Sequence, residues 1–197
     1  MIDTSSDFGP APLDAPAVYP GRWPGGPVEV THDQVVPLRR PLDPLQKMGR
    51  TPVLAIGSNA CPAQLQRKSL GDLVYLTPVT IRNHVIVYAG HLTRYGAVPA
   101  TPMRWAGARS EVFIAWLTQG QQITMDQSEN GNYQPVLIPT EAGPMAAYRA
   151  VTGILQDDAG HAIRLASVTT HGPNLPRAMT QAEVQDQVKG SQTLTLR

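Results

Sequence analysis

Proline is unevenly distributed along this chain of 197 residues, and its distribution limits where regular structure can form. Nine of the 19 prolines lie in the first fifty residues, at positions 10, 12, 16, 20, 24, 27, 37, 41 and 44. Proline lacks the backbone N–H that helices and central strands need, so residues 1–50 are predicted to form an extended arm. Two interpretations stay open: the arm wraps the rest of the chain through Phe8, Tyr19, Trp23 and Val35-Val36, or it is a flexible tail.

The sequence pattern changes at residue 51, where short runs rich in β-branched and aromatic residues recur at regular spacing. Such runs predict strands, and their number with few helix signals predicts one domain over residues 51–197 built on a mixed sheet or barrel. The predicted strands are 52–56, 73–81, 83–89, 111–117, 133–138, 146–152 and 162–168.

Three short helices are expected. Residues 60–70 form the first, with Pro62 in its first turn, where the missing N–H costs little. Thr118 with Gln121, and Thr180 with Glu183, match the capping-box pattern and predict helix starts at those two positions. Glu129 then lies at the end of the helix that follows Thr118.

Composition excludes several classes of function. The formal net charge of +1 gives no general electrostatic basis for binding nucleic acid. The single cysteine, Cys61, and five histidines without metal-ligand spacing argue against a metal site. No nucleotide-binding motif, membrane-spanning run or signal peptide is recognisable, so we expect a cytoplasmic protein without cofactor, membrane or nucleic-acid partner. The oligomeric state is left open.

Two segments carry residues suited to chemistry. Gly57, Ser58 and Asn59 follow an apolar strand and precede a helix, a setting in which free backbone N–H groups bind a carboxylate or amide oxygen. Glycine there permits a positive φ and a close backbone approach. Glu129 follows an apolar helix face, where partial burial would suit it to general base work, with Asp126 as the rival acid. Taken separately, each segment is better explained without chemistry: the first as an ordinary turn with Asn59 as a helix cap, and the second as a solvated surface acid.

The stretch between these segments is locally basic. Residues 73–110 contain four arginines but neither Asp nor Glu. A basic surface of this kind suits an acidic small molecule, although the arginines are equally able to pair with acids elsewhere in the fold. The arginines are Arg82, Arg94, Arg104 and Arg109.

Four segments in this order resemble the gamma-glutamylcyclotransferase-like superfamily. The resemblance spans about residues 52 to 140 and is carried by Leu54-Ala-Ile-Gly-Ser-Asn59, Tyr95-Gly-Ala-Val-Pro-Ala-Thr101, Val112-Phe-Ile-Ala-Trp116 and Met125-Asp-Gln-Ser-Glu129 followed by Tyr133. It implies a compact α+β fold in which a mixed sheet closes into a small β-barrel with a few short helices. It also implies that Glu129 is the general acid/base and that a glutamyl group is bound by Ile56, Gly57, Ser58, Asn59, Ala60 and Tyr133.

The resemblance implies an enzyme that cleaves a γ-glutamyl amide or amine by intramolecular attack, releasing 5-oxoproline and a free amine. Two departures affect this expectation: Ile56 stands where the family usually has Tyr, and Asn130 replaces the usual Gly after the acid. Two alternatives follow from the residues. The chain is a non-catalytic member that binds a small acidic ligand, or it is an interaction module that acts through the proline-rich arm.

Overall fold

The computed structural model describes residues 8–68, 70–71, 73–129 and 131–190, and its centre is a β-sheet that closes on itself. The closing strands are β3 (Arg50–Ala55), β4 (Val74–Tyr88), β5 (Ala100–Thr118), β6 (Tyr133–Thr140) and β7 (Gly143–Ala150). Strand β4 pairs with β5 and β6, β5 with β3, and β6 with β7, all antiparallel, while a parallel bridge from β7 to β3 completes the ring. The predicted fold class, an α+β structure around a small β-barrel, is confirmed.

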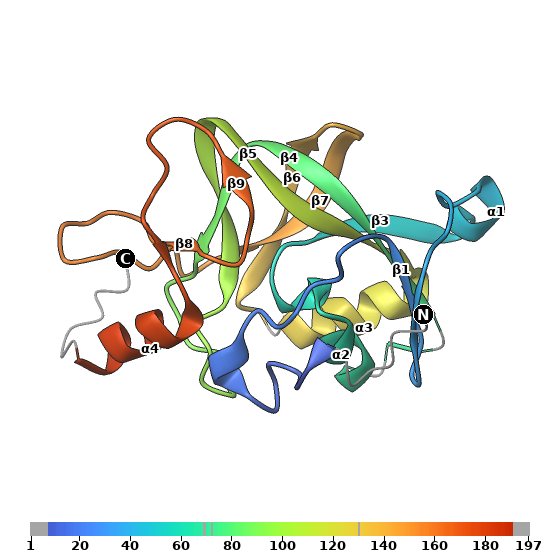
Figure 1. Cartoon of the computed structure of the whole chain (residues 1–197), viewed down its shortest axis with the longest axis horizontal. Helices are drawn as coiled ribbons and strands as arrows, with labels where there is room; N and C mark the ends of the chain where they lie inside the picture. Colours follow the sequence, from blue (N-terminus) through green and yellow to red (C-terminus); the bar gives the residue numbers. More distant parts are fainter. Residues whose placement is uncertain (1–7, 69, 72, 130, 191–197) are drawn as a thin grey trace.

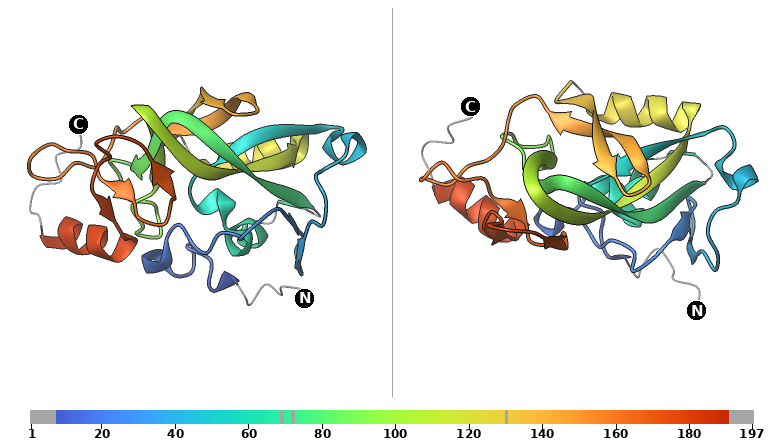
Figure 2. Two further views of the ribbon diagram at one scale, coloured as in Figure 1. Left: turned by 45° about the horizontal axis from the view of Figure 1, so that its top comes forward. Right: turned by 90° about the horizontal axis from the view of Figure 1, so that it is seen from above.

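The longest unit of the barrel is the coiled ribbon formed by β4 and β5, which crosses the molecule in Figure 2. The sequence pattern predicted two strands, 73–81 and 83–89, where the structure has one. The register shifts at Asn83, which adopts a positive φ of 56° and accepts a hydrogen bond from the N–H of Gly107 at 3.0 Å. Asn tolerates this conformation, so the interruption is a β-bulge within a continuous strand.

Both faces of β3 are buried, against different sets of side chains. Along this strand, Leu54 and Ile56 alternate with Val53 and Ala55. Leu54 and Ile56 belong to the cluster that fills the barrel, to which all five barrel strands contribute. Val53 and Ala55 belong to a second cluster outside the barrel. Because successive side chains of a strand point to opposite faces, the chain directs Ile56 inward at the end of β3.

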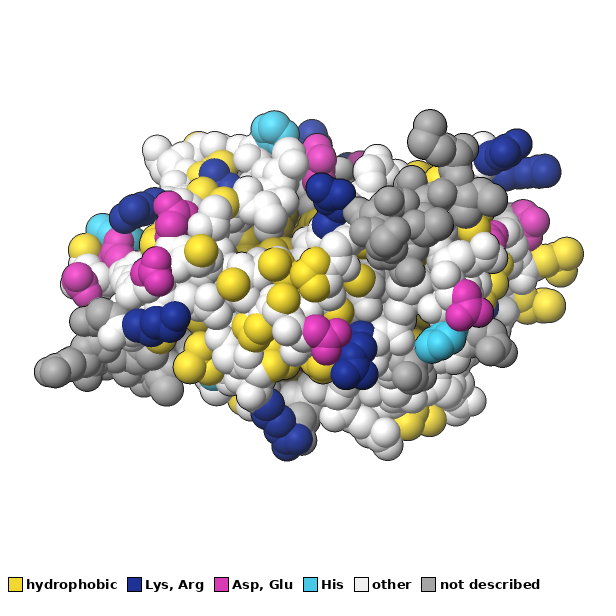
Figure 3. Space-filling model, turned by 60° about the horizontal axis from the view of Figure 1, so that its bottom comes forward, with side chains coloured by type: hydrophobic (Ala, Val, Ile, Leu, Met, Phe, Trp, Pro, Cys, Tyr) yellow, Lys and Arg dark blue, Asp and Glu magenta, His cyan; other side chains and the backbone are white. Residues whose placement is uncertain are grey.

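The proline-rich segment covers the outside of the barrel. Its strand β1 (Val28–Val30) pairs with β4 and with β2 (Val35–Pro37). Phe8 and Val35 are buried in the second cluster. The 3₁₀ turn η2 (Pro16–Val18) lies on the face shown in Figure 3, where hydrophobic side chains occupy the middle of the surface. Residues 8–37 therefore pack against the barrel over much of their length.

The helices are α1 (Pro44–Lys47), η3 (Ser58–Ala60), α2 (Pro62–Arg67), α3 (Gln119–Glu129) and α4 (Gln181–Gly190). In Figure 1, α2, α3 and α4 lie below the barrel strands, whereas α1 lies at the far right beside the start of β3. Pro62 sits at the start of α2 as predicted, but α2 is shorter than the expected 60–70 because η3 precedes it. No described helix is long and apolar enough to cross a membrane.

The last predicted strand, 162–168, is mostly wrong. Only Arg164–Leu165 form a strand, β8, which pairs with β4 and with β10 (Ala178–Met179). The N–H of Val168 bonds back to Leu165 at 3.3 Å, which turns the chain toward β9 (Thr170–His171) on β5. The apolar residues of this segment contribute to the barrel core from a turn. Buried apolar residues in a turn and in a strand give the same sequence pattern, so the pattern predicts a strand here.

Both predicted capping boxes are present. At the start of α3, Thr118 Oγ1 accepts from Gln121 N at 3.3 Å and Gln121 Oε1 accepts from Thr118 N at 2.9 Å. At the start of α4, Glu183 Oε2 accepts from Thr180 N at 2.7 Å and Thr180 Oγ1 accepts from Glu183 N at 3.3 Å. Each box satisfies N–H groups that the first helical turn leaves without a partner.

Removing the Thr118 cap is expected to destabilise the fold modestly. Thr118→Ala should lower the free energy of unfolding by about 1 kcal/mol, because an orphan N–H of α3 loses its acceptor. Urea denaturation measures the change. Thr180→Ala, which removes the equivalent cap of α4, is measured beside it for comparison. An unchanged unfolding midpoint in Thr118→Ala would show that the cap does not hold α3 in place.

Candidate active site

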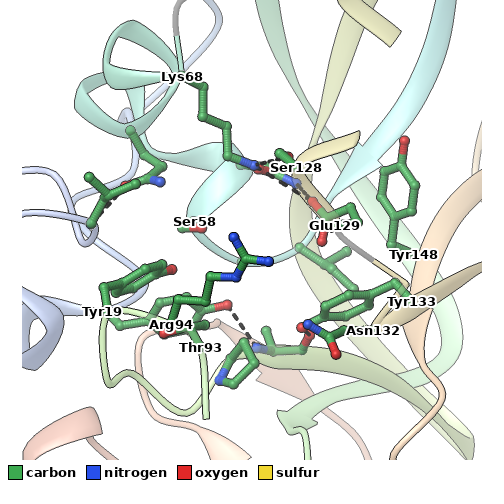
Figure 4. Close-up of a pocket in the computed structure, with 18 of the residues that line it drawn as sticks. Tyr19, Ser58, Lys68, Thr93, Arg94, Ser128, Glu129, Asn132, Tyr133 and Tyr148 are labelled. Carbon is green, nitrogen blue, oxygen red and sulfur yellow. Dashed lines mark hydrogen bonds and ion pairs between the residues drawn. The ribbon is translucent and has the colours of Figure 1, made fainter. Parts of the chain in front are cut away.

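A cavity of about 330 Å³ opens beside the barrel where the end of β3, the end of α3 and the N-terminal arm meet. Figure 4 shows Lys68 reaching in from α2, Tyr19 from the arm, and Tyr133 from the opposite wall. The cavity holds one acid, a lysine, an arginine, a histidine (His91) and four tyrosines among its described walls. Its charged and phenolic residues are Glu129, Lys68, Arg94, Tyr19, Tyr95, Tyr133 and Tyr148.

The turn at Gly57 is shaped by a close contact. Gly57 has φ −140°, so the expected positive φ is wrong. A Cβ at this position would overlap the Tyr19 hydroxyl and approach Ala100 Cβ to 3.1 Å. Glycine is therefore required here because the arm packs directly on the turn, which is the close approach that the residue type permits.

Asn59 does not cap a helix, because Cys61 is the residue that precedes α2. Its amide instead connects two charged residues of the cavity. Asn59 Nδ2 donates to Glu129 Oε1 at 3.2 Å, and Asn59 Oδ1 accepts from Lys68 Nζ at 2.7 Å. The lysine thus fixes the orientation in which the amide N–H faces the carboxylate.

Glu129 lies at the last position of α3, with its side chain 15% exposed in the cavity. Its Oε1 is also 3.6 Å from Lys68 Nζ. Asp126, the rival acid, lies one turn back on the same helix and accepts a short hydrogen bond from the Tyr148 hydroxyl. Only Glu129 of the two lines the cavity.

Lys68 is the cavity residue with the most polar contacts, and sequence reasoning missed it. In addition to Asn59 and Glu129, its ammonium donates to Ser128 Oγ at 2.9 Å. Its pKa is lowered by burial, an effect that the neighbouring Glu129 carboxylate opposes. The residue follows a short helix without any motif, so no feature of the sequence distinguishes it from a surface lysine.

Three tyrosines form the wall opposite Lys68. Ala100 at the start of β5 joins two of them: its N–H donates to Tyr19 Oη at 2.7 Å, and its carbonyl accepts from the Tyr133 hydroxyl at 3.2 Å. Tyr95 contributes a third hydroxyl, which lies close to the side chains of Ser58 and Thr93. Burial is the main cause that raises the pKa of each phenol, so all three are neutral donors at physiological pH.

These phenols are expected to make the protein sensitive to alkali. The pKa of folded Tyr133 is raised well above the ordinary 10.0, so between these two values the unfolded chain loses a proton that the folded protein keeps. The stability from this group is complete below pH 10.0 and is lost as the pH rises toward the folded pKa. Thermal unfolding should therefore show a shallower alkaline decline in Tyr133→Phe. An equal decline in both proteins would contradict the burial argument.

The structure brings most of the expected site residues together. Ile56, Gly57, Ser58, Asn59, Glu129 and Tyr133 all line the cavity. Ala60, the last residue of η3, does not, because it is fully buried in the second cluster. Of the four arginines, only Arg94 reaches the cavity, and Arg82 and Arg109 face each other across β4 and β5 on the exposed surface. Asn130 lies outside the described residues.

Cys61 is fully buried, and burial raises the pKa of its thiol. Within the described part of the chain, no three His, Cys, Asp or Glu side chains lie close enough to hold a metal ion. The polar groups of the cavity that are suited to chemistry include its acid, its cations, its hydroxyls and the imidazole of His91, whose pKa is lowered by burial.

Comparisons with known proteins give similarities at the level of structure. No family model and no curated protein sequence matches the chain. Among solved structures, a gamma-glutamyl cyclotransferase aligns with a TM-score of 0.44 and 13% identity, over 52% of this chain and 67% of that one. An uncharacterized protein from Homo sapiens aligns with a TM-score of 0.45 and 14% identity, over 53% of this chain and 69% of that one.

The cavity combines features that proton-transfer chemistry needs. A carboxylate lies within reach of a small ligand, an amide N–H and an ammonium group orient it, and neutral phenols line the opposite wall. Its volume is at the lower end of the range for small-molecule sites.

Proposed function

We propose that this protein is an enzyme that cleaves a γ-glutamyl amide or amine, releasing 5-oxoproline and a free amine. The observation that carries the proposal is the hydrogen bond from Asn59 Nδ2 to Glu129 Oε1, at 3.2 Å. It brings the turn that precedes α2 next to the acid that ends α3. One small molecule can therefore contact both. The proposal also rests on the motif resemblance, which assigns these same residues to substrate binding and acid/base chemistry.

The proton balance of the reaction needs a single carboxylate. Glu129 accepts a proton from the α-ammonium group of the substrate, and the freed amine attacks the γ-carbonyl carbon of the same molecule. The new C–N bond closes a five-membered ring. Protonated Glu129 then donates to the leaving nitrogen as its bond to the γ-carbon breaks, which restores the carboxylate. The ring nitrogen loses its second ammonium proton as the intermediate collapses, and the released amine takes up this proton and leaves as an ammonium ion. Because the attack is intramolecular, proximity supplies much of the rate and little other machinery is required.

The other polar residues have supporting roles in this scheme. Lys68 partly balances the charge of Glu129 and, through Asn59, holds its oxygen in place. Arg94, an exposed residue that lines the cavity and is labelled in Figure 4, has no acidic partner among the described ion pairs. Its guanidinium is available to a carboxylate of the substrate. The cavity thus favours an acidic small molecule.

A second candidate is a binding protein for a small acidic ligand. The Lys68 contact favours it, since an ammonium beside the carboxylate occupies the oxygen that must accept a proton. Ile56 also presents an apolar side chain to the cavity where the related family has a phenol. A protein of this class would bind γ-glutamyl compounds without converting them.

The nature of the product distinguishes cyclisation from hydrolysis and from binding. The protein is incubated with γ-glutamyl amines and γ-glutamyl amino acids in water enriched in heavy oxygen, and products are identified by mass spectrometry. Cyclisation gives 5-oxoproline without the label, because water takes no part. Labelled glutamate would show hydrolysis, and an unchanged substrate with measurable affinity would support the binding protein.

A further inference from the structure

The N-terminal arm contributes Tyr19, whose phenol is held inside the cavity beside the Gly57 turn. The side chain is 6% exposed, and its ring belongs to the cluster that fills the barrel. The hydroxyl lies where a side chain at Gly57 would otherwise be. The sequence gives no sign of this role, since Tyr19 lies 38 residues before Gly57 in a proline-rich stretch.

Contacts on both sides fix the arm at this place. Leu13 N donates to Gln64 Oε1 of α2 at 3.0 Å, and Asp14 forms an exposed ion pair with Arg67 at 3.1 Å. Beyond Tyr19, the backbone of Gly21 runs so close to Cys61 that a Cβ on Gly21 would lie 2.5 Å from the sulfur. Two glycines, Gly21 in the arm and Gly57 in the turn, thus allow the arm to press against the turn.

The hydrogen bonds of Tyr19 determine where its proton points. The N–H of Ala100 donates to the phenol oxygen at 2.7 Å, and the backbone of Ser58 lies beside the same oxygen. Among the described residues, no side chain or carbonyl accepts the hydroxyl proton in a hydrogen bond, and the phenol lines the cavity. A phenol that accepts a hydrogen bond is polarised and donates more strongly.

We propose that Tyr19 is a substrate-binding residue that donates its hydroxyl proton to the α-carboxylate of the glutamyl group, so that the N-terminal arm forms part of the site. This inference rests on the proposed function. The ammonium and carboxylate groups of an α-amino acid share one carbon atom. Glu129 receives the ammonium group at the Asn59 end of the turn, and Tyr19 lies at the Gly57 end of the same three residues.

The Tyr19 hydroxyl lies on the same cavity wall as the apolar side chain of Ile56. This residue ends the strand that leads into the turn, and its side chain brings no hydrogen-bond donor to the cavity. Tyr19 brings a hydroxyl to the same wall from a different part of the chain. Substrate binding in this protein therefore depends on correct packing of residues 13–21 as well as on the barrel.

Two substrates separate the binding role of Tyr19 from a structural one. The first is a γ-glutamyl amide, and the second is its analogue in which the α-carboxylate is replaced by a carboxamide. For Tyr19→Phe, KM of the acid is expected to rise about tenfold or more, with kcat changed less than about threefold. KM of the carboxamide analogue should change far less. An equal effect on both substrates would show that the phenol only holds the fold, and a lower KM would show that it blocks the site; either result overturns the inference.

A second variant displaces the arm and leaves the phenol intact. Gly21→Ala forces the backbone away from Cys61, whereas Gly9→Ala has a comparable positive φ, 66° against 83°, with open space around it. Gly21→Ala should reproduce the selective rise in KM, and Gly9→Ala should not. Equal behaviour of the two variants would contradict the role of the arm.

The affinity of 5-oxoproline, measured by calorimetry, provides a readout that needs no turnover. Tyr19→Phe should weaken its binding about tenfold, since the product keeps the carboxylate. Glu129 is judged by release of 5-oxoproline and Tyr19 by affinity, so the proposed reaction and this inference can fail separately. Undiminished affinity in Tyr19→Phe would refute the inference even if turnover depends on Glu129.

Discussion

Glu129→Gln is expected to lower kcat for release of 5-oxoproline by about a thousandfold, while the protein remains folded. Glutamine has the same shape and can still accept a hydrogen bond from Asn59 at the position of Oε1. It cannot accept the ammonium proton, so the attacking amine stays protonated. Loss of a general acid/base costs roughly two to four powers of ten in rate, and here one residue serves in both steps.

Asp126→Asn is the matched control for this variant. Asp126 lies on the same helix, one turn earlier, and its contact is with the Tyr148 hydroxyl outside the proposed chemistry. Steady-state assays of the two variants should show near-normal turnover in Asp126→Asn only. Substantial turnover by Glu129→Gln, with circular dichroism unchanged, would remove Glu129 from the mechanism.

Gly57→Ala is expected to have the second largest effect. The added methyl group overlaps the Tyr19 hydroxyl and meets Ala100 Cβ at 3.1 Å, and both neighbours are buried. Overpacking of this kind costs about 1 to 3 kcal/mol, and a protein of this size then loses several degrees in Tm. Since the turn and Tyr19 must separate, turnover should fall at least tenfold as well.

Gly25→Ala controls for the general effect of replacing a glycine, because its added Cβ meets nothing within 4 Å. Differential scanning calorimetry and the 5-oxoproline assay should find Gly25→Ala close to the wild type. If Gly57→Ala were equally well tolerated, the contact between the arm and the turn would not be tight, and the account of the cavity wall would be wrong.

Much of the barrel could be predicted because its residues carry local signals. Alternation of apolar side chains marks β5 near Val112. Capping boxes at Thr118 and Thr180 mark the starts of α3 and α4. The bulge at Asn83 was missed because a single residue with positive φ leaves no trace in hydrophobic periodicity. The short strand β8 was overextended because buried residues in a turn and in a strand have the same composition.

The site was predictable only where its residues fall within motifs. Gly57, Asn59 and Glu129 belong to segments whose order supported one site, and the cavity includes all three. Lys68 and Tyr19 were missed, since each reaches the cavity through tertiary packing of α2 and of the arm. The resemblance places Ala60 in the site as well, whereas η3 turns its side chain toward the core.

The central claim, that Glu129 and the Gly57 turn act on one γ-glutamyl molecule, is tested most directly by assaying the wild-type protein and Glu129→Gln on a panel of γ-glutamyl amides and amines. The measurement is the rate at which 5-oxoproline forms. The account predicts that at least one compound yields 5-oxoproline with the wild type and that this release is lost in Glu129→Gln. No release from any compound by the folded wild-type protein, or equal release by both proteins, would contradict it.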